Sequence, residues 1–171
     1  DDQVVAAKIS DGTCDIFIAT KEGMSIRFNE DDVRGMGRSA RGVKGITLSK
    51  EDIVVGMLVL EKNTTDTILM VTGKGYGKRS ETSEYRVQSR GGVGIITQKT
   101  TDKVGNVVGT TKVKATQELI LSTDQGQVIR MKISDISVLG RNTQGVRLIN
   151  LDEKQEFVTS LAVVDDEEKA G

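Results

Sequence analysis

The chain has 171 residues, with 24 basic and 25 acidic side chains, one cysteine and no histidine. The absence of histidine excludes imidazole catalysis and His-ligated metals, and the lone Cys14 excludes an internal disulfide and a cysteine zinc cluster. No apolar run approaches the roughly 18 residues of a membrane span and no signal peptide opens the chain, so we expect a cytoplasmic protein with no membrane partner.

The first expected element is a strand at residues 4–9 (VVAAKI). Its sequence resembles residues 53–60 and 106–113, which end later units of the chain. We therefore expect residues 1–10 to form the last strand of a preceding unit.

Three continuous apolar runs predict strands that are buried on both faces: residues 15–20 (DIFIAT), 67–72 (TILMVT) and 118–123 (ELILST). Each run ends in a turn that closes with a glycine, at Gly23, Gly75 and Gly126. Glycine supplies the positive φ that a tight hairpin needs. We therefore expect a second strand after each turn, at residues 24–28, 76–80 and 128–133.

Polar loops rich in glycine and arginine follow the second strands, at residues 34–42, 86–94 and 138–145. A third strand is expected after each closing glycine, as at residues 146–151, and a fourth near Val54, Val107 and Val158. No segment of ten residues has helical periodicity. The pattern predicts an all-β chain.

This order of apolar run, turn glycine and polar loop recurs about every fifty residues. Like the turn glycines, three further columns step by 52 and then 51 residues: Arg27, Arg79 and Arg130; Arg38, Arg90 and Arg141; Gly42, Gly94 and Gly145. Units of this length with four short strands are typical of propeller blades. We predict a propeller-like fragment of about three four-stranded blades, at residues 11–62, 63–115 and 116–164, with an acidic tail at residues 165–171.

Several phrases resemble the C-terminal domain of DNA gyrase A. They are GKGYGKR (residues 73–79), EYR (84–86), GRNTQGV (140–146), SIRFN (25–29) and VRGMGRSARGVKG (33–45), and the resemblance runs in order from about residue 2 to residue 164. It implies a β-pinwheel, in which six propeller-like blades exchange strands and DNA wraps around the outer rim. This chain is similar to the last three blades.

The signature of that family is a seven-residue box of Gln, basic, basic, Gly, Gly, basic, Gly in the first blade. Residues 88–94 (QSRGGVG) match it in part, but Ser89 and Val93 stand where basic residues belong. We interpret this segment as a degenerate counterpart in a middle blade and expect the true box upstream of Asp1. A strong box and six blades would favour gyrase over the paralogous topoisomerase IV.

Positive side chains in the loops suggest an interface for double-stranded DNA. Arg38, Arg90 and Arg141 fall at equivalent places, so stacked units align them along one edge, where a row of cations suits the phosphates of a bent duplex. The predicted DNA-binding residues are Arg34, Arg38, Arg41, Lys44, Lys78, Arg86, Arg90, Arg141 and Arg147.

Two expectations concern the second strands. Lys78, beside Arg79 in the GYGKR phrase, is expected to be exposed and available to phosphate. The column of Arg27, Arg79 and Arg130 is expected to be structural, paired across blades with recurring carboxylates such as Asp32, Glu84 or Asp135.

By resemblance, the chain is a DNA-wrapping accessory domain of a type IIA topoisomerase, whose partners are double-stranded DNA, the remainder of gyrase A and, through it, gyrase B, in the bacterial cytoplasm at the nucleoid. We expect no catalytic residue, metal or cofactor, and GKGYGK lacks the GKS or GKT phrase of a nucleotide loop. The alternatives are the equivalent C-terminal domain of topoisomerase IV, or a propeller-type module that binds acidic protein partners.

Overall fold

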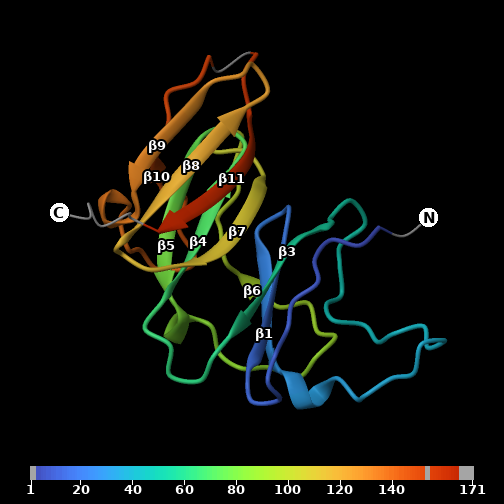
Figure 1. Ribbon diagram of the computed structural model, residues 1–171. Helices are drawn as coiled ribbons and strands as arrows, with labels where there is room; N and C mark the ends of the chain where they lie inside the picture. Colours follow the sequence, from blue (N-terminus) through green and yellow to red (C-terminus); the bar gives the residue numbers. More distant parts are fainter. Residues whose placement is uncertain (1–2, 153–154, 166–171) are drawn as a thin grey trace.

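The computed structural model describes residues 3–152 and 155–165, and this part of the chain is all-β (Figure 1). Its strands are β1 (Asp15–Thr20), β2 (Met24–Asn29), β3 (Val54–Leu60), β4 (Thr67–Thr72), β5 (Tyr76–Glu81), β6 (Ile95–Ile96), β7 (Val107–Val113), β8 (Gln117–Thr123), β9 (Val128–Lys132), β10 (Val146–Arg147) and β11 (Val158–Asp165). Short 3-10 turns at Glu30–Asp32, Thr82–Glu84 and Ile133–Asp135 follow β2, β5 and β9. None of the described helices is long and apolar enough to cross a membrane.

The strands form three antiparallel sheets. The strand order is β3-β1-β2-β6 in the first sheet, β10-β5-β4-β7 in the second and β11-β8-β9 in the third. The third strand of a unit pairs with the sheet of the unit before it, so that Ile96 faces Met24 and Arg147 faces Tyr76. Neighbouring units therefore exchange strands, as the family resemblance implies. The third sheet has three strands instead of four, because no described segment follows to supply an edge strand to β9.

The hairpin turns follow from the glycines that close them. Gly23, Gly75 and Gly126 have φ values of +85°, +78° and +85°. Only glycine adopts this conformation without strain, and β1, β4 and β8 each pair with the strand directly after the turn. The predicted hairpins are confirmed in all three units.

Burial on both faces holds only for β4, in which all six residues are buried. The second sheet lies between the other two (Figure 1), so both of its faces are covered. In β1 and β8 buried residues are interspersed with half-buried ones, because these strands pack a neighbouring sheet on one face only. The prediction of burial on both faces is wrong for these two strands.

The core divides into layers between the sheets. Phe17 and Leu60 of the first sheet pack against Ile68 and Met70 of the second. On the opposite face of β4, Leu69 and its neighbours pack against the third sheet. The edge strand β7 lies beside both β3 and β11, which places β6 and β10 at the opposite edges of their sheets.

Residues 4–9 do not form the predicted strand. No residue from 3 to 14 lies in a strand, and the side chains of Val4 and Ile9 are 90% and 97% exposed. A strand persists when its backbone pairs with a neighbour and one face is buried, and this segment has neither among the described residues. The predicted acidic tail lies outside the described residues, apart from Asp165 at the end of β11.

Candidate nucleic-acid interface

The glycine-rich loops lie against the sheet of the preceding unit. The backbone N–H of Gln88 donates to the carbonyl of Arg27 over 2.7 Å, and the N–H of Leu139 donates to the carbonyl of Arg79 over 2.8 Å. The two acceptors are 52 residues apart and the two donors are 51 residues apart, as the repeat requires. They therefore form the same contact in successive units. The loops then lead into β6 and β10, so they follow the sheet edges that face away from β3, β7 and β11.

Two arginines of the predicted row also fasten one unit to the next. The Nε of Arg90 donates to the carbonyl of Asp32 over 3.1 Å, and its Nη1 donates to the carbonyl of Lys44. The Nη1 of Arg141 donates to the carbonyl of Ile96 over 2.8 Å. Both side chains are half-buried. Because a guanidinium carries five N–H donors, each arginine retains donors beyond these contacts.

The remaining loop cations are exposed. They are Arg34, Arg38, Arg41, Lys44, Arg86 and Arg147. Arg38 lies in a loop whose residues from 31 to 42 are all exposed, so its environment differs from that of Arg90 and Arg141. The structure therefore separates the predicted site residues into exposed, half-buried and, for Lys78, buried positions.

Lys78 is not available to phosphate, and the prediction of an exposed side chain is wrong. Its side chain is fully buried, and its Nζ donates to the carbonyls of Gly140, Arg141 and Thr143 and to the Thr143 hydroxyl. Burial lowers the pKa of Lys78 to about 8, with the Arg141 charge acting in the same direction and Glu84 against it. Lys78 thus anchors the loop that carries Arg141.

The arginines of the second strands are structural, as predicted, but their partners differ from the prediction. Arg27 pairs with Asp15 across its own sheet over 2.7 Å, and Arg130 pairs with Glu118 in the same way. Across the sheet boundary, Arg27 and Arg79 donate to backbone carbonyls instead of carboxylates. Both ion pairs are diagonal, because Arg27 faces Phe17 and Arg130 faces Ile120 in the strand register. Diagonal neighbours on paired strands are within reach of a long side chain.

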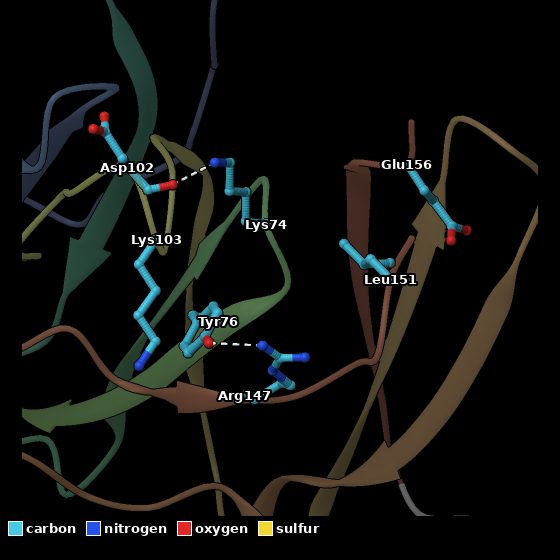
Figure 2. A pocket seen from close by; sticks show the side chains of 7 residues that line it. All are labelled: Lys74, Tyr76, Asp102, Lys103, Arg147, Leu151 and Glu156. Atoms are coloured by element: carbon cyan, nitrogen blue, oxygen red, sulfur yellow. Dashed lines mark hydrogen bonds between the residues drawn. The ribbon is translucent and has the colours of Figure 1, made fainter. Parts of the chain in front are cut away.

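A cavity of about 350 Å³ that the loop pattern does not reveal lies beside the second hairpin turn (Figure 2). Lys74, Lys103 and Arg147 line it together with Tyr76. In the first sheet, Met24 and Ile96 hold the places of Tyr76 and Arg147. Tyr76 and Arg147 differ in residue type from their counterparts in the first sheet, and this difference is the sequence signal that could have identified the pocket.

Among the described residues, the side chains of Asp11, Cys14 and Glu30 bring potential metal ligands within 4.8 Å of one another. Their contacts are local: the Sγ of Cys14 lies 3.3 Å from Asp11, and Asp11 also accepts from Thr13. Desolvation raises the pKa of the Cys14 thiol. This favours a protonated thiol, and Cys14 is buried.

Comparison with known proteins agrees with the fold. The family described as DNA gyrase C-terminal domain, beta-propeller, matches residues 15–61, 66–114 and 117–165. DNA gyrase A of Staphylococcus aureus is 46% identical over 164 residues, which make up 96% of this chain and 18% of that protein. The chain thus spans less than a fifth of the length of the curated relatives that it matches.

Two solved structures are similar over most of the chain. The C-terminal domain of DNA topoisomerase IV superposes with a TM-score of 0.88 at 25% identity, covering 96% of this chain and 51% of that one. The DNA gyrase A C-terminal domain superposes with a TM-score of 0.79 at 28% identity, covering 88% of this chain and 50% of that one. The three sheets therefore reproduce about half of each of these domains.

Proposed function

This chain belongs to the DNA gyrase C-terminal domain family, and on that premise we propose that it bends double-stranded DNA around its outer edge for a type IIA topoisomerase. In this function the chain performs no chemistry of its own. It holds a duplex in a wrap, so that strand passage and ATP hydrolysis by the rest of the enzyme introduce negative supercoils.

The repetition of one loop supports this proposal best. Successive loops lie at equivalent sheet edges and carry Arg90 and Arg141 at the same place, with exposed cations such as Arg86 and Arg147 nearby. Each phosphate that a cation neutralises releases counterions. Smooth bending of a short duplex costs on the order of 1–6 kcal/mol, so several such contacts are required. A row repeated from unit to unit supplies them.

The gyrase assignment is favoured over topoisomerase IV by the identity of 46% across nearly the whole chain to a DNA gyrase A. The proposed partners are double-stranded DNA, the remainder of gyrase A and, through it, gyrase B, in the bacterial cytoplasm at the nucleoid. The competing hypothesis, a module for acidic protein partners, predicts no dependence of function on DNA.

Titration of duplex DNA over a series of salt concentrations tests the proposal. The variant with Arg38, Arg90 and Arg141 all replaced by Ala is expected to bind more weakly, with a slope of log K against log salt smaller by up to about 3, near one for each lost phosphate contact. Arg130→Ala is the control, because Arg130 is exposed but lies in β9, outside the loops. An unchanged slope in the triple variant would remove these residues from the DNA path.

Since Arg90 and Arg141 also fasten neighbouring units, the thermal stability of each variant must be measured beside its affinity. Arg38→Ala is the cleanest single variant, because its loop is exposed. Wrapping itself is measured as the change in linking number of a relaxed plasmid that is nicked and resealed with the chain bound. Binding without any change in linking number would mean that the chain holds DNA but does not wrap it.

A further inference from the structure

Three cations line the cavity beside the second hairpin, and two of them lie over one aromatic ring. The Nζ of Lys103 lies 5.7 Å from the centroid of the Tyr76 ring, and the guanidinium carbon of Arg147 lies 5.4 Å from it. The Tyr76 hydroxyl accepts a hydrogen bond of 3.0 Å from Arg147. Figure 2 shows Lys103 and Arg147 on different sides of the ring, with Lys74 beside Asp102 and with Leu151 and Glu156 on the opposite side of the cavity.

Neither lysine of this group forms an ion pair with a carboxylate of the described residues. Glu156 lines the cavity, but its carboxylate accepts hydrogen bonds from the hydroxyl of Thr123 over 2.6 Å and from a backbone N–H. Lys74 donates to the backbone carbonyl of Asp102, not to its carboxylate. Among the described residues, the Lys103 ammonium forms no ion pair, and it lies over the Tyr76 ring. A cation–π contact weakens the field of an ammonium little, so Lys103 keeps its charge for a ligand.

The fold does not require these cations, because the repeat supplies the same backbone without them. In the first unit, Glu22 and Met24 hold the positions of Lys74 and Tyr76, and Ile96 takes the place of Arg147 in the paired edge strand. In the third unit, Gln125 and Gln127 stand at the positions of Lys74 and Tyr76. The cluster is therefore a feature of the middle unit alone.

We propose that the cavity formed by Lys74, Tyr76, Lys103 and Arg147 binds phosphate groups, and we call it the Tyr76 pocket. That the phosphates come from the wrapped duplex rests on the proposed function. The Tyr76 side chain is buried under the two cations, and its residue is only 7% exposed, so it cannot stack on a base. The ligand is therefore the phosphate and not the nucleobase, and the pocket reads no sequence.

Lys103 is the residue to test, because it is exposed and makes no hydrogen bond among the described residues that its removal would break. The first unit offers a matched control in Lys50, which is exposed and precedes β3 by four residues, as Lys103 precedes β7. In the full chain, Lys103→Ala is expected to lower the salt slope of duplex binding by about 0.9, the value for one phosphate contact. Lys50→Ala is expected to leave the slope unchanged.

The source of the phosphate is distinguished by following the ring resonances of Tyr76 in the NMR spectrum. Movement on addition of a short duplex, but not of millimolar inorganic phosphate, supports a site for the DNA backbone. Saturable movement with inorganic phosphate supports the same pocket as a site for free phosphate. The proposal is overturned if the Tyr76 resonances stay in place with both and Lys103→Ala keeps the wild-type slope.

The two proposals fail in different ways. If the wild-type chain binds no duplex, the proposed function is wrong. The titration with inorganic phosphate then decides by itself whether the Tyr76 pocket binds phosphate. If the chain binds duplex and responds to loss of the loop arginines but not of Lys103, the proposed function survives and the pocket is wrong.

Discussion

The two boundaries between neighbouring sheets share one backbone pattern but are filled by different side chains. At the first boundary the Tyr85 ring lies edge-on to Phe17, with centroids 5.0 Å apart, and its hydroxyl forms a hydrogen bond of 2.8 Å with Thr97. At the second boundary Ile136 takes the place of Tyr85 and packs in an apolar cluster. An aromatic ring with one polar contact fills the first boundary, and an aliphatic side chain fills the second.

On the neighbouring strands, β2 and β5, the polar residue belongs to the second boundary instead of the first. Ile26 in β2 is fully buried, whereas the second unit has the buried Lys78 at the same position. Lys78 needs acceptors for its ammonium and finds them in the loop at residues 140–143. At this position the second boundary holds a buried charge and the first holds an apolar side chain.

The strand arginines differ as well. Arg27 has a carboxylate partner in Asp15, whereas Thr67 holds the equivalent position in the second sheet. The Nε of Arg79 donates to the carbonyl of Ile136 instead. The repeat therefore specifies backbone pairing, while the side chains at each boundary provide their own hydrogen-bond partners. A substitution at equivalent positions is therefore expected to have unequal effects.

The largest expected effect is at the hairpin glycines. Gly75→Val combines a strained positive φ with overlap, because a Cβ at this position would lie 2.7 Å from the Cγ2 of Ile149 and 2.9 Å from its carbonyl oxygen. We expect a loss of about 4 kcal/mol or more in the free energy of unfolding, measured by urea denaturation. Gly126→Val is the control, since its φ is +85° but no atom lies within 4 Å. Equal losses would show that φ alone sets the cost.

The next effect concerns the strand arginines. Arg27→Met leaves the buried carboxylate of Asp15 without its ion pair and removes donors from the carbonyls of Thr82 and Tyr85. We expect it to cost about 3 kcal/mol of unfolding free energy, as for a broken buried pair. Arg79→Met is expected to cost about 1 kcal/mol, the value for one hydrogen bond. A larger loss for Arg79→Met than for Arg27→Met would contradict this order of effects.

Lys78→Met is expected to lower the free energy of unfolding by about 2 kcal/mol at pH 7, because three carbonyls lose their donor. The folded pKa of about 8 lies below the ordinary value of 10.5. Between these values the unfolded state binds more protons, so the wild-type chain gains stability as the pH rises through this window.

Lys78→Met lacks this titration, so the stability difference between wild type and variant is expected to widen by about 1–3 kcal/mol from pH 7 to pH 10. Denaturation of both proteins at the two pH values measures the difference, because other titrating groups cancel. A difference that does not change with pH would mean that the carbonyls offset the cost of burying the ammonium.

The smallest expected effect belongs to the Tyr85 hydroxyl. Tyr85→Phe removes the hydrogen bond to Thr97 inside a buried cluster and is expected to cost about 1 kcal/mol. A double-mutant cycle with Thr97→Val isolates the bond, since the second substitution removes the orphaned hydroxyl. Additive losses would show that the two hydroxyls do not stabilise each other.

Much of the fold could be predicted because its signals are local. The bounds of β1 and β4 match the predicted runs at residues 15–20 and 67–72, and the turn glycines have the predicted positive φ. The third strand could not be bounded in this way. A strand is expected at residues 146–151, but it contains only Val146–Arg147, because its partner β5 begins at Tyr76. Leu148 and Ile149 both donate to the carbonyl of Gly75 in the hairpin turn.

The amino-acid sequence by itself determined the repeat, the hairpins and the loops that carry Arg38, Arg90 and Arg141, because spacing and glycine conformation depend on neighbours along the chain. The tertiary structure alone decided that β6 and β10 join the preceding sheets, that Lys78 is buried, and that Tyr76 lines a cavity together with three cations. Each of these depends on which unit lies beside which. Contacts between residues some fifty or more apart leave no mark on local periodicity.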